Sequence, residues 1–352
     1  MDRRLVVLYT HPKSSSFVRK DLAILNLDFD VRTFEFVPRN KFWLPLTFLH
    51  QFVHILLNGR EVDIYIIQFG GYASFLPVFV AKLLKKPSLI ITGGTDCVSF
   101  PNIKYGNFAK VVLGWFTRQS LRHATAISSV HESLQYQTYE YDIESPRNQG
   151  YVTWTGADPS KDHVIYNGYE FDVFKKLDWV ERRCNSYLTV LANPQSRFAR
   201  TLKGIDIILD LARMKPEAQF TVVGGPHGFR LLEAPKNVSF KPFAGPDELC
   251  REMNQHEFYV QLSLSEGFPN ALCEAMLCGC IPLVSHVAAM PFIVDGLGVV
   301  VKRRGADFVM EALENFGPLP QPEEIRERIV QRFPLEKRSA ELRQLVRNLC
   351  TS

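Results

Sequence analysis

The chain of 352 residues is long enough for two domains of ordinary size, each with its own hydrophobic core. Hydrophobic residues make up 46% of it and charged residues 22%, a balance that excludes a largely disordered protein. The formal net charge of +4 is too small to indicate nucleic-acid binding, but it is compatible with an anionic ligand or an anionic membrane surface.

Seven cysteines, an odd number with no zinc-binding spacing, are interpreted as reduced thiols, most of them buried. The apolar run in MDRRLVVLYTH is too short for a signal peptide and predicts a first strand. No stretch reaches the roughly 18 apolar residues that a membrane span requires. We therefore expect a cytoplasmic protein.

Short β-branched runs alternate with longer helical patterns through the first half of the chain. Such alternation predicts a parallel sheet with helices on both faces. The predicted strands lie at 4–11, 30–36, 63–70, 87–94 and 124–130, and the predicted helices at 15–25, 46–58, 73–85 and 107–123.

The second half has the same design without a repeat in sequence. Its predicted strands lie at 187–193, 219–225, 257–265, 281–287 and 297–302, with helices starting near Lys203, Pro246 and Asn270. Residues 163–174 read as a strand that runs into a turn. The expected fold class is α/β, with two Rossmann-like doubly wound domains that face each other across a cleft.

We divide the chain into an N-terminal domain and a C-terminal domain. The N-terminal domain takes residues 1–168, a linker takes 169–182, and the C-terminal domain takes 183–330. A closing helix is expected in 331–352. Because ligands of doubly wound sheets bind beyond the carboxyl ends of the strands, the chemistry is expected directly after them.

A basic loop follows the strand at 187–193. Arg197, Arg200 and Lys203 lie there, beside the start of a helix. Helix amides, the planar fork of an arginine and the point charge of a lysine together suit a diphosphate. The alternative is an ordinary solvated basic loop, since exposed charges are common.

Two further strand ends carry candidate ligand contacts. The glycines of GGPHG (224–228) allow close approach of a ligand to the backbone, although the same residues form ordinary turns. After the strand at 257–265, Glu266 ends an apolar run, which suits a carboxylate that accepts hydrogen bonds from sugar or ribose hydroxyls. Asn270 is the predicted N-cap of the next helix, and Glu274 follows in its first turns, where the helix dipole alone also favours a carboxylate.

In the first half, Asp96 follows a strand in TGGTD (92–96) and could contact a donor sugar or an acceptor. The loop HPKSSSF (11–17) also follows a strand and opens a helix. Its residues Ser14, Ser15 and Ser16 are candidates for binding an acceptor or a phosphate. The acidic pair of DFD (28–30) resembles a metal-binding motif, but it begins an alternating strand, so no metal site is predicted there.

Four segments together resemble a known family: SEGFPNALCEAMLCGCIPLVS, VIYNGYEFDVF, FTVVGGP and RFARTLKG. The first contains two glutamates with seven residues between them, and the chain is similar to glycosyltransferase family 4, the retaining group 1 enzymes of the GT-B fold. The resemblance covers nearly the whole chain and is densest in its second half. It implies that the closing helix in 331–352 crosses back to the first domain. It implies transfer of a sugar from a nucleotide to an acceptor, with no cofactor and no metal.

The resemblance also implies a role for each matching residue. Glu274 would hold the ribose hydroxyls and Glu266 the hydroxyls of the donor sugar. Arg197 and Lys203 would neutralise the leaving diphosphate, which is the main catalytic task. Arg200 could replace Arg197. The remaining expected donor contacts are Gly224, Gly225, Pro226, Gly267, Phe268, Pro269, Asn270 and Ala271, and Asp96 completes the catalytic set. Gly93 stands where many members of the family have a histidine.

The acceptor is expected to be a saccharide or a lipid-linked saccharide in surface polysaccharide or glycolipid biosynthesis. Basic and aromatic residues mix in 38–57 and in 108–123, a composition that suits contact with a cytoplasmic membrane leaflet. The alternative is that both helices only cover the sheet.

The leading hypothesis is therefore a retaining, metal-independent hexosyltransferase, with a UDP-sugar as the favoured donor and no nucleic-acid partner. A non-catalytic subunit that binds a nucleotide-sugar is one alternative, and another GT-B enzyme such as a sugar-nucleotide epimerase is a second.

Overall fold

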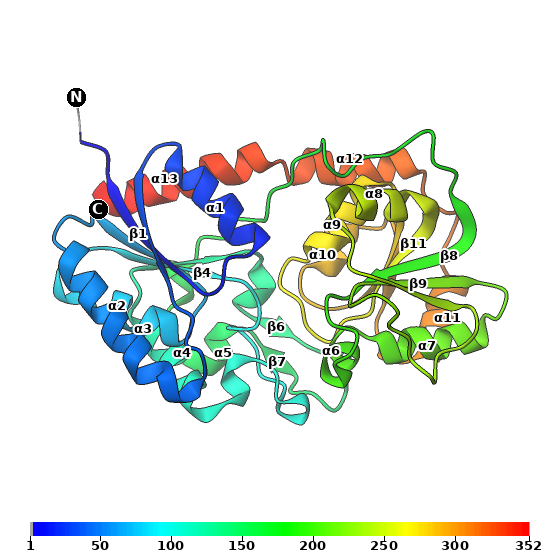
Figure 1. Cartoon of the computed structure of the whole chain (residues 1–352), viewed down its shortest axis with the longest axis horizontal. Coiled ribbons are helices and arrows are strands. Elements are labelled where there is room, and N and C mark those ends of the chain that lie inside the picture. The colour runs from blue at the N-terminus through cyan, green and yellow to red at the C-terminus, as the bar shows by residue number, and fades with distance from the viewer. Residues whose placement is uncertain (1–2, 352) are drawn as a thin grey trace. The chain divides into compact units, whose positions relative to one another are not determined.

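The computed structural model describes residues 3–351, which form two compact units (Figure 1). The first unit consists of residues 3–138, 148–168 and 336–351, and the second of residues 139–147 and 169–335. The expected division placed 139–147 in the first domain and treated 169–182 as a linker. Both segments instead pack within the second unit. The closing helix from Glu336 onward belongs to the first unit.

The first unit is built on a five-stranded parallel sheet in the order β2-β1-β3-β4-β5. Every residue of β1, β3, β4 and β5 is buried, which explains the continuous apolar runs in β1, β3 and β4. The strands are β1 (Val6–His11), β2 (Asp30–Glu35), β3 (Ile64–Gln68), β4 (Ser88–Thr92) and β5 (Ala126–Ser129).

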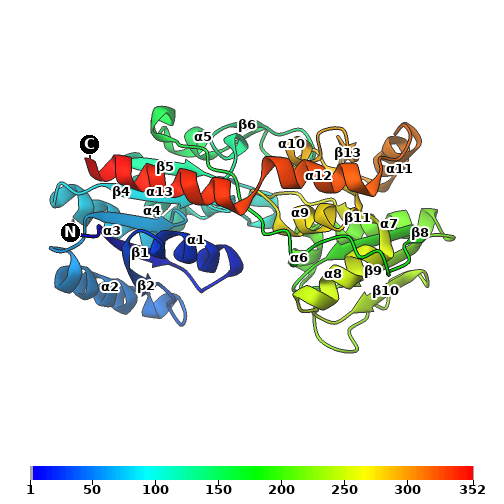
Figure 2. The ribbon, with the colours of Figure 1, turned by 90° about the horizontal axis from the view of Figure 1, so that it is seen from above.

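Helices cover both faces of this sheet, as Figure 1 shows. On one face lie α1 (Ser16–Asn26) and α13 (Leu335–Thr351), which run beside each other (Figure 2). On the other face α2 (Leu44–Asn58), α3 (Tyr72–Leu83) and α4 (Val111–His123) pack side by side. The smaller elements of the unit are β6 (Gln137–Thr138), β7 (Asn148–Gln149), α5 (Tyr151–Thr155) and the 3-10 turns η1 (Lys41–Trp43), η2 (Pro101–Ile103), η3 (Asn107–Ala109), η4 (Glu132–Leu134) and η5 (Pro159–Lys161).

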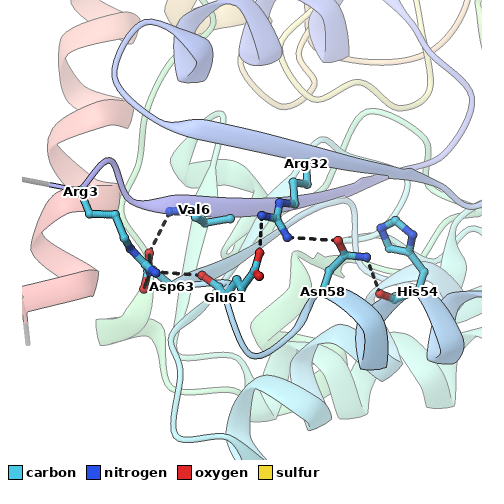
Figure 3. Close-up of polar contacts among 7 residues, drawn as sticks. All are labelled: Arg3, Val6, Arg32, His54, Asn58, Glu61 and Asp63. Atoms are coloured by element: carbon cyan, nitrogen blue, oxygen red, sulfur yellow. Dashed lines mark hydrogen bonds and ion pairs between the residues drawn. The ribbon is translucent and has the colours of Figure 1, made fainter.

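Polar contacts fasten the end of α2 to the neighbouring strands (Figure 3). Asp63, just before β3, accepts hydrogen bonds from Arg3 at 2.8 Å and from the backbone of Val6 at 2.8 Å. Arg32 of β2 donates to Glu61 at 2.5 Å and to Asn58 at 3.2 Å. The two acidic side chains between α2 and β3 are thus already paired with cations.

The second unit contains a six-stranded parallel sheet in the order β10-β9-β8-β11-β12-β13. The main strands agree with the sequence-based expectation. The short strand β10 was not predicted, because NVSFK offers too few residues for a pattern. The strands are β8 (Arg183–Val190), β9 (Gln219–Val223), β10 (Val238–Lys241), β11 (His256–Gln261), β12 (Ile281–Ser285) and β13 (Val299–Val301).

Helices also cover both faces of the second sheet (Figure 1). One face carries α7 (Ile205–Met214) and α11 (Ala306–Glu314), and the other α8 (Pro246–Gln255), α9 (Asn270–Leu277) and α10 (Met290–Val294), with α12 (Pro322–Arg332) packed on α9. A short helix α6 (Arg197–Leu202) precedes α7 and was not predicted. The strand expected in 163–174 is absent, since these residues form turns and isolated bridges. Among residues 3–351, no helix is both long and apolar enough to cross a bilayer.

Candidate functional site

The predicted donor residues of the second unit come from loops at one edge of its sheet. The strands β8, β9 and β11 are mutually parallel, so their carboxyl ends lie at the same edge. The loop after β8 carries Arg197 and Lys203, the loop after β9 carries Gly224 and Gly225, and the loop after β11 carries Glu266. The fold therefore gathers groups that are up to 69 positions apart in the chain.

Lys203 and Glu266 form an ion pair within this edge. The Lys203 Nζ atom lies 2.5 Å from Oε1 of Glu266. The lysine side chain is 33% exposed and the glutamate only 10%, so the pair is half shielded from water yet open on the lysine side. A cation held in this way is preorganised to meet an anionic ligand.

The backbone around Lys203 explains why the pair forms. Gly204 has a φ of +72°, and a Cβ atom there would lie 2.2 Å from the carbonyl oxygen of Leu262. The turn between α6 and α7 can therefore approach β11 this closely only with glycine. The backbone N–H of Leu264 also donates to the carbonyl of Leu202 at 2.8 Å, which fixes the Lys203 loop against the Glu266 loop.

Three residues that support Glu266 were missed in the sequence. Gln261, the last residue of β11, donates from Nε2 to the Glu266 carboxylate at 2.7 Å. The hydroxyls of Tyr139 and Tyr141 donate to the carbonyls of Leu264 and Leu262 at 2.9 and 3.4 Å. Segment 139–147 thus braces the backbone that leads to Glu266. The only sequence signal was the closely spaced tyrosines of QTYEYD in a polar segment.

The two arginines of the basic loop lie on α6 rather than in the open loop that the sequence suggested. Arg200 donates from Nη1 to the carbonyls of Pro194 at 2.8 Å and Gln195 at 3.2 Å, so it stabilises its own loop. Arg197 is exposed and has no ion-pair partner among residues 3–351. Arg197 is therefore the arginine that is available to a ligand.

The glycine loop after β9 lies close to the end of β8. Gly224 has a φ of +135°, and a Cβ atom there would lie 2.0 Å from the carbonyl oxygen of Leu191. A Cβ atom on Gly225, where φ is +82°, would lie 2.6 Å from the ring of Pro194. The glycines are thus needed for packing of the backbone itself, and Pro226 after them is exposed.

Helix α9 starts one residue earlier than expected. Pro269 is the N-cap and Asn270 is the first helical residue, which corrects the prediction that Asn270 caps the helix. The Asn270 side chain instead accepts a hydrogen bond from the hydroxyl of Tyr169 at 3.0 Å. Cys273 is the first residue whose N–H reaches back into the helix start, so the amides of the preceding turn have no intrahelical acceptor.

Glu274 lies in the second turn of α9 and is partly exposed. The negative charges of Glu274 and Glu266 both affect the pKa of Tyr259 on β11. Burial chiefly raises the pKa of the Tyr259 hydroxyl well above its usual value, and the negative charges of Glu266 and Glu274 raise it further. Both carboxylates follow β11 in the chain, Glu266 in the loop after it and Glu274 on α9. Of their neighbours, Gly267, Phe268 and Pro269 are buried and Ala271 is half-buried.

In the first unit, Asp96 is 1% exposed and its carboxylate is occupied by backbone groups. It accepts hydrogen bonds from the N–H of Gly70 at 2.9 Å and from those of Gly93 and Gly94 at 3.1 Å each. Burial raises its pKa, and these amides oppose that shift. Asp96 ties together the loops that follow β3 and β4, while its catalytic role stays a prediction.

The serines of the loop after β1 also belong to the first unit. Ser15 is the N-cap of α1, but its side chain makes no capping hydrogen bond, and its buried hydroxyl has no partner. Ser14 and Ser16 are exposed. Within the part of the chain that the structure describes, no group of three or more His, Cys, Asp or Glu side chains could hold a metal ion. Metal independence stays a prediction.

Taken together, this edge of the second unit offers two accessible cations, helix amides and two carboxylates. Such a set can bind an anionic group beside a polyhydroxylated one. The comparisons with known proteins agree with this chemistry. Residues 195–316 match the family model "Glycosyl transferases group 1". This matched stretch contains Arg197, Lys203, both glycines of the β9 loop and both glutamates.

Two curated relatives are similar in sequence. D-inositol 3-phosphate glycosyltransferase from Mycobacterium sp. (strain JLS) is 29% identical over 162 residues, which are 42% of this chain and 37% of the relative. A subunit of phosphatidylinositol N-acetylglucosaminyltransferase from Arabidopsis thaliana is 24% identical over 234 residues, 61% of this chain and 51% of the relative. The matches thus span about a third to a half of these relatives.

Among solved structures, Anabaena HepE in complex with UDP matches 98% of this chain and 100% of its own length, with a TM-score of 0.68 and 12% sequence identity. This likeness extends to other solved glycosyltransferases. The chain has the GT-B fold of two Rossmann-like domains, as the sequence predicted.

Proposed function

We propose that the protein is a retaining glycosyltransferase that moves a hexose from a UDP-sugar to a saccharide or lipid-linked saccharide. One observation carries the proposal. The ion pair of Lys203 and Glu266 lies at the sheet edge from which α9, the helix that carries Glu274, begins. The candidate site, the match to the glycosyl transferase group 1 model and the GT-B fold all support the transfer of a sugar from a nucleotide.

In this mechanism the protein supplies binding, positioning and charge stabilisation. Glu274 accepts hydrogen bonds from the ribose hydroxyls, and Glu266 orients the donor sugar. As the bond between the sugar and the diphosphate breaks, negative charge grows on the diphosphate. Lys203, Arg197 and the amides at the start of α9 stabilise that charge, so the proposed reaction needs neither a metal nor a cofactor.

A UDP-sugar is the favoured donor because HepE, which shares the fold along its whole length, was solved with UDP. For the acceptor, the Arabidopsis relative is named for a reaction on phosphatidylinositol, a membrane lipid. The exposed apolar residues of α2 and of the preceding turn η1 support contact of the first unit with a cytoplasmic leaflet. We place the activity in the synthesis of a surface polysaccharide or a glycolipid.

The first experiment measures thermal unfolding of the wild type with UDP-, GDP- and ADP-sugars. A ligand at about 100 times its dissociation constant should stabilise the fold by about 2.7 kcal/mol. We expect UDP-sugars to raise the midpoint of the wild type, and Glu274→Ala and Lys203→Ala to lose this shift. The exposed Glu314 at the end of α11 provides a control, because Glu314→Ala should respond like the wild type.

A second experiment measures whether the protein slowly hydrolyses the UDP-sugar when no acceptor is present. This activity distinguishes an enzyme from a subunit that only binds the nucleotide-sugar. We expect the wild type to release UDP from the UDP-sugar and Lys203→Ala to release it at least about 100-fold more slowly, since charge stabilisation at this position acts on the transition state. Binding of the UDP-sugar with no hydrolysis and no transfer to any lipid-linked acceptor would contradict catalysis. A folded wild type that no nucleotide-sugar stabilises would contradict the donor site itself.

A further inference from the structure

The first unit contains a cavity of about 330 Å³ beside the loops that follow β3 and β4. That volume suits part of a small molecule rather than a whole nucleotide-sugar. The wall consists mainly of apolar side chains and of backbone. The residues that the argument uses are Phe36, Pro38, Phe69, Tyr72, Gly93 and Leu113.

The Asp96 carboxylate and the side-chain amides of Asn107 and Gln68 already make hydrogen bonds within the protein. Asp96 accepts its three backbone N–H bonds. Asn107 donates from Nδ2 to the carbonyl of Gly70 at 2.8 Å, and Gln68 accepts from the hydroxyl of Tyr9 at 2.7 Å. No lysine or arginine of residues 3–351 lines the cavity. A ligand group that enters it meets apolar surface without an available charge, which favours hydrocarbon over phosphate or a carboxylate.

Phe69 forms part of this wall in a strained backbone conformation. Its φ is +70°, in the left-handed region that bulky side chains rarely adopt. The conformation is held by the N–H of Phe69, which donates to the carbonyl of Ile91 at 2.9 Å, and by edge contact of its ring with Phe17 at 5.4 Å. Strain of this kind persists where the surroundings enforce it, and it concentrates at functional sites.

Gly93 leaves the space that the Phe69 ring occupies. A Cβ atom at position 93 would lie 2.2 Å from Cε1 of Phe69, closer than any real contact. Residue 93 must therefore be glycine as long as the ring holds this position. The chain thus places an aromatic ring at the strand end where the resemblance to the family led us to look for a histidine, and it exchanges a polar group for an apolar one.

Residues close in the chain to the cavity lining are apolar and exposed. Pro38 leads directly to η1, where Phe42 is 84% exposed, and Leu113 follows Val111, which is 92% exposed. Tyr72 of α3 contacts Phe48 of α2 and Phe116 of α4 through their rings, at 6.3 and 5.1 Å. Helices α2, α3 and α4 therefore share one aromatic cluster that reaches from the cavity toward the exposed surface.

We propose that this cavity binds a hydrocarbon segment of the acceptor and that Phe69, with the space left by Gly93, determines this specificity. The inference rests on the proposed function and narrows its acceptor to a lipid-linked one. A saccharide without a lipid would leave the apolar wall and its strained phenylalanine unused. The chain that continues from the cavity would lie along the exposed apolar residues of η1 and α4.

The test uses two probes that share a sugar and differ in hydrocarbon. Octyl glucoside, kept below its micelle concentration, and methyl glucoside are titrated into the full-length protein by calorimetry. We expect the wild type to bind octyl glucoside at one site and methyl glucoside at least about tenfold more weakly, because burial of hydrocarbon provides the affinity. Equal affinity for both probes would overturn the proposal in favour of recognition of the sugar ring.

Three variants locate the binding. Gly93→Ala displaces the Phe69 ring and should weaken the binding of octyl glucoside about tenfold. If this variant does not fold, Phe69→Gly keeps the test open. Glycine adopts the positive φ without strain, which offsets part of the lost ring packing, while the apolar wall is removed. Leu57→Ser, on the outer side of α2 and 80% exposed, is the control and should bind like the wild type.

The outcomes separate this inference from the proposed function. Thermal stabilisation by UDP-sugar depends on the second unit, and the three variants should all keep it. Suppose that the affinity for octyl glucoside falls in Leu57→Ser but not in Gly93→Ala or Phe69→Gly. The cavity would then not be the hydrocarbon site, even if UDP-sugar still binds. Loss of UDP-sugar binding in the wild type would instead overturn the proposed function.

Discussion

Arg197 and Arg200 lie three residues apart on α6, yet their surroundings differ. Arg200 holds the loop before the helix through the carbonyls of Pro194 and Gln195, whereas Arg197 extends into solvent. Because a guanidinium that is already satisfied by carbonyls loses those bonds when it turns to a ligand, Arg197 can bind a diphosphate at lower cost. The sequence left the choice between the two residues open.

Exchange of each arginine for alanine separates these roles. We expect Arg197→Ala to weaken UDP binding about tenfold without a change in the thermal midpoint, because a charge-assisted hydrogen bond contributes about 1.5–3 kcal/mol. Arg200→Ala should instead lower the free energy of unfolding by about 1 kcal/mol through its lost backbone contacts. Titration with UDP by calorimetry and unfolding in urea measure the two quantities.

Each variant serves as the control for the other, since both remove one positive charge from the same short helix. A purely long-range electrostatic effect would weaken UDP binding equally in both variants and depend steeply on salt. Equal losses would therefore contradict a direct contact from Arg197. A lower stability of Arg197→Ala than of Arg200→Ala would contradict the structural role of Arg200.

Among the elements, α13 is attached to the first unit by a buried ion pair. Arg338 donates from Nε and Nη2 to both carboxylate oxygens of Asp21 on α1, each at 2.8 Å. Arg338 is 5% exposed and Asp21 is 1% exposed, and the same arginine also donates to the carbonyls of Ile165 and Tyr166. The helix thus closes over α1 with a polar contact in its buried face.

Removal of one partner should leave the other charge buried and unpaired. We expect Arg338→Ala to lower the free energy of unfolding by about 3–5 kcal/mol. Arg347 on the same helix pairs with Asp28 while 46% exposed, so Arg347→Ala should cost less than about 1 kcal/mol. Urea unfolding followed by circular dichroism measures both values. Similar small losses in the two variants would show that the buried pair contributes little.

The sequence predicted the regular elements well because their signals are local. Continuous apolar runs such as IYIIQ and SLIIT identify buried parallel strands, and the helical patterns between them identify the covering helices. The motifs also singled out Lys203 and Glu266, which the structure brings together as an ion pair, while their roles stay a prediction. What the sequence did not reveal depends on contacts between distant positions. Gln261 beneath Glu266 and the tyrosines of 139–147 become meaningful only when β11 is in place.

The fit between Phe69 and Gly93 was beyond local prediction for the same reason. A phenylalanine before two glycines reads as the end of a strand, and nothing in its neighbours indicates a positive φ. Only the parallel pairing of β3 with β4 brings residue 69 next to residue 93. The sequence showed that Gly93 departs from the family pattern, but the structure was needed to show which side chain takes the space.

On the scale of the whole molecule, charge is distributed unevenly. Residues 36–131 contain ten Lys and Arg but only three Asp and Glu, so they carry a formal charge of +7 in a chain of +4. Two of the acids, Glu61 and Asp63, pair with Arg32 and Arg3, and the third, Asp96, is buried. This cationic part of the first unit also carries the exposed apolar residues of α2, which suits a membrane surface with anionic lipids.

We expect the protein to bind vesicles that contain anionic phospholipid and to release them as salt rises, because each basic residue near the surface contributes about 1 kcal/mol. The apolar face supplies the other part of the affinity. Leu49→Ser and Leu57→Ser, both more than half exposed, should together lower vesicle binding at least about tenfold and leave UDP binding unchanged. Vesicle flotation measures the first quantity and calorimetry the second.

Leu232 gives the matched control, since it is a fully exposed leucine that belongs to the second unit rather than to the cationic part of the first. Leu232→Ser should float with vesicles like the wild type. If Leu232→Ser lost as much vesicle binding as the combined Leu49→Ser and Leu57→Ser variant, the attraction would be nonspecific hydrophobic adsorption. If neither the double variant nor Leu232→Ser lost vesicle binding, and neutral vesicles bound as well as anionic ones, the apolar face of α2 would not be a membrane surface. Its exposed leucines would then indicate a protein partner, because large exposed apolar patches usually mark interaction sites.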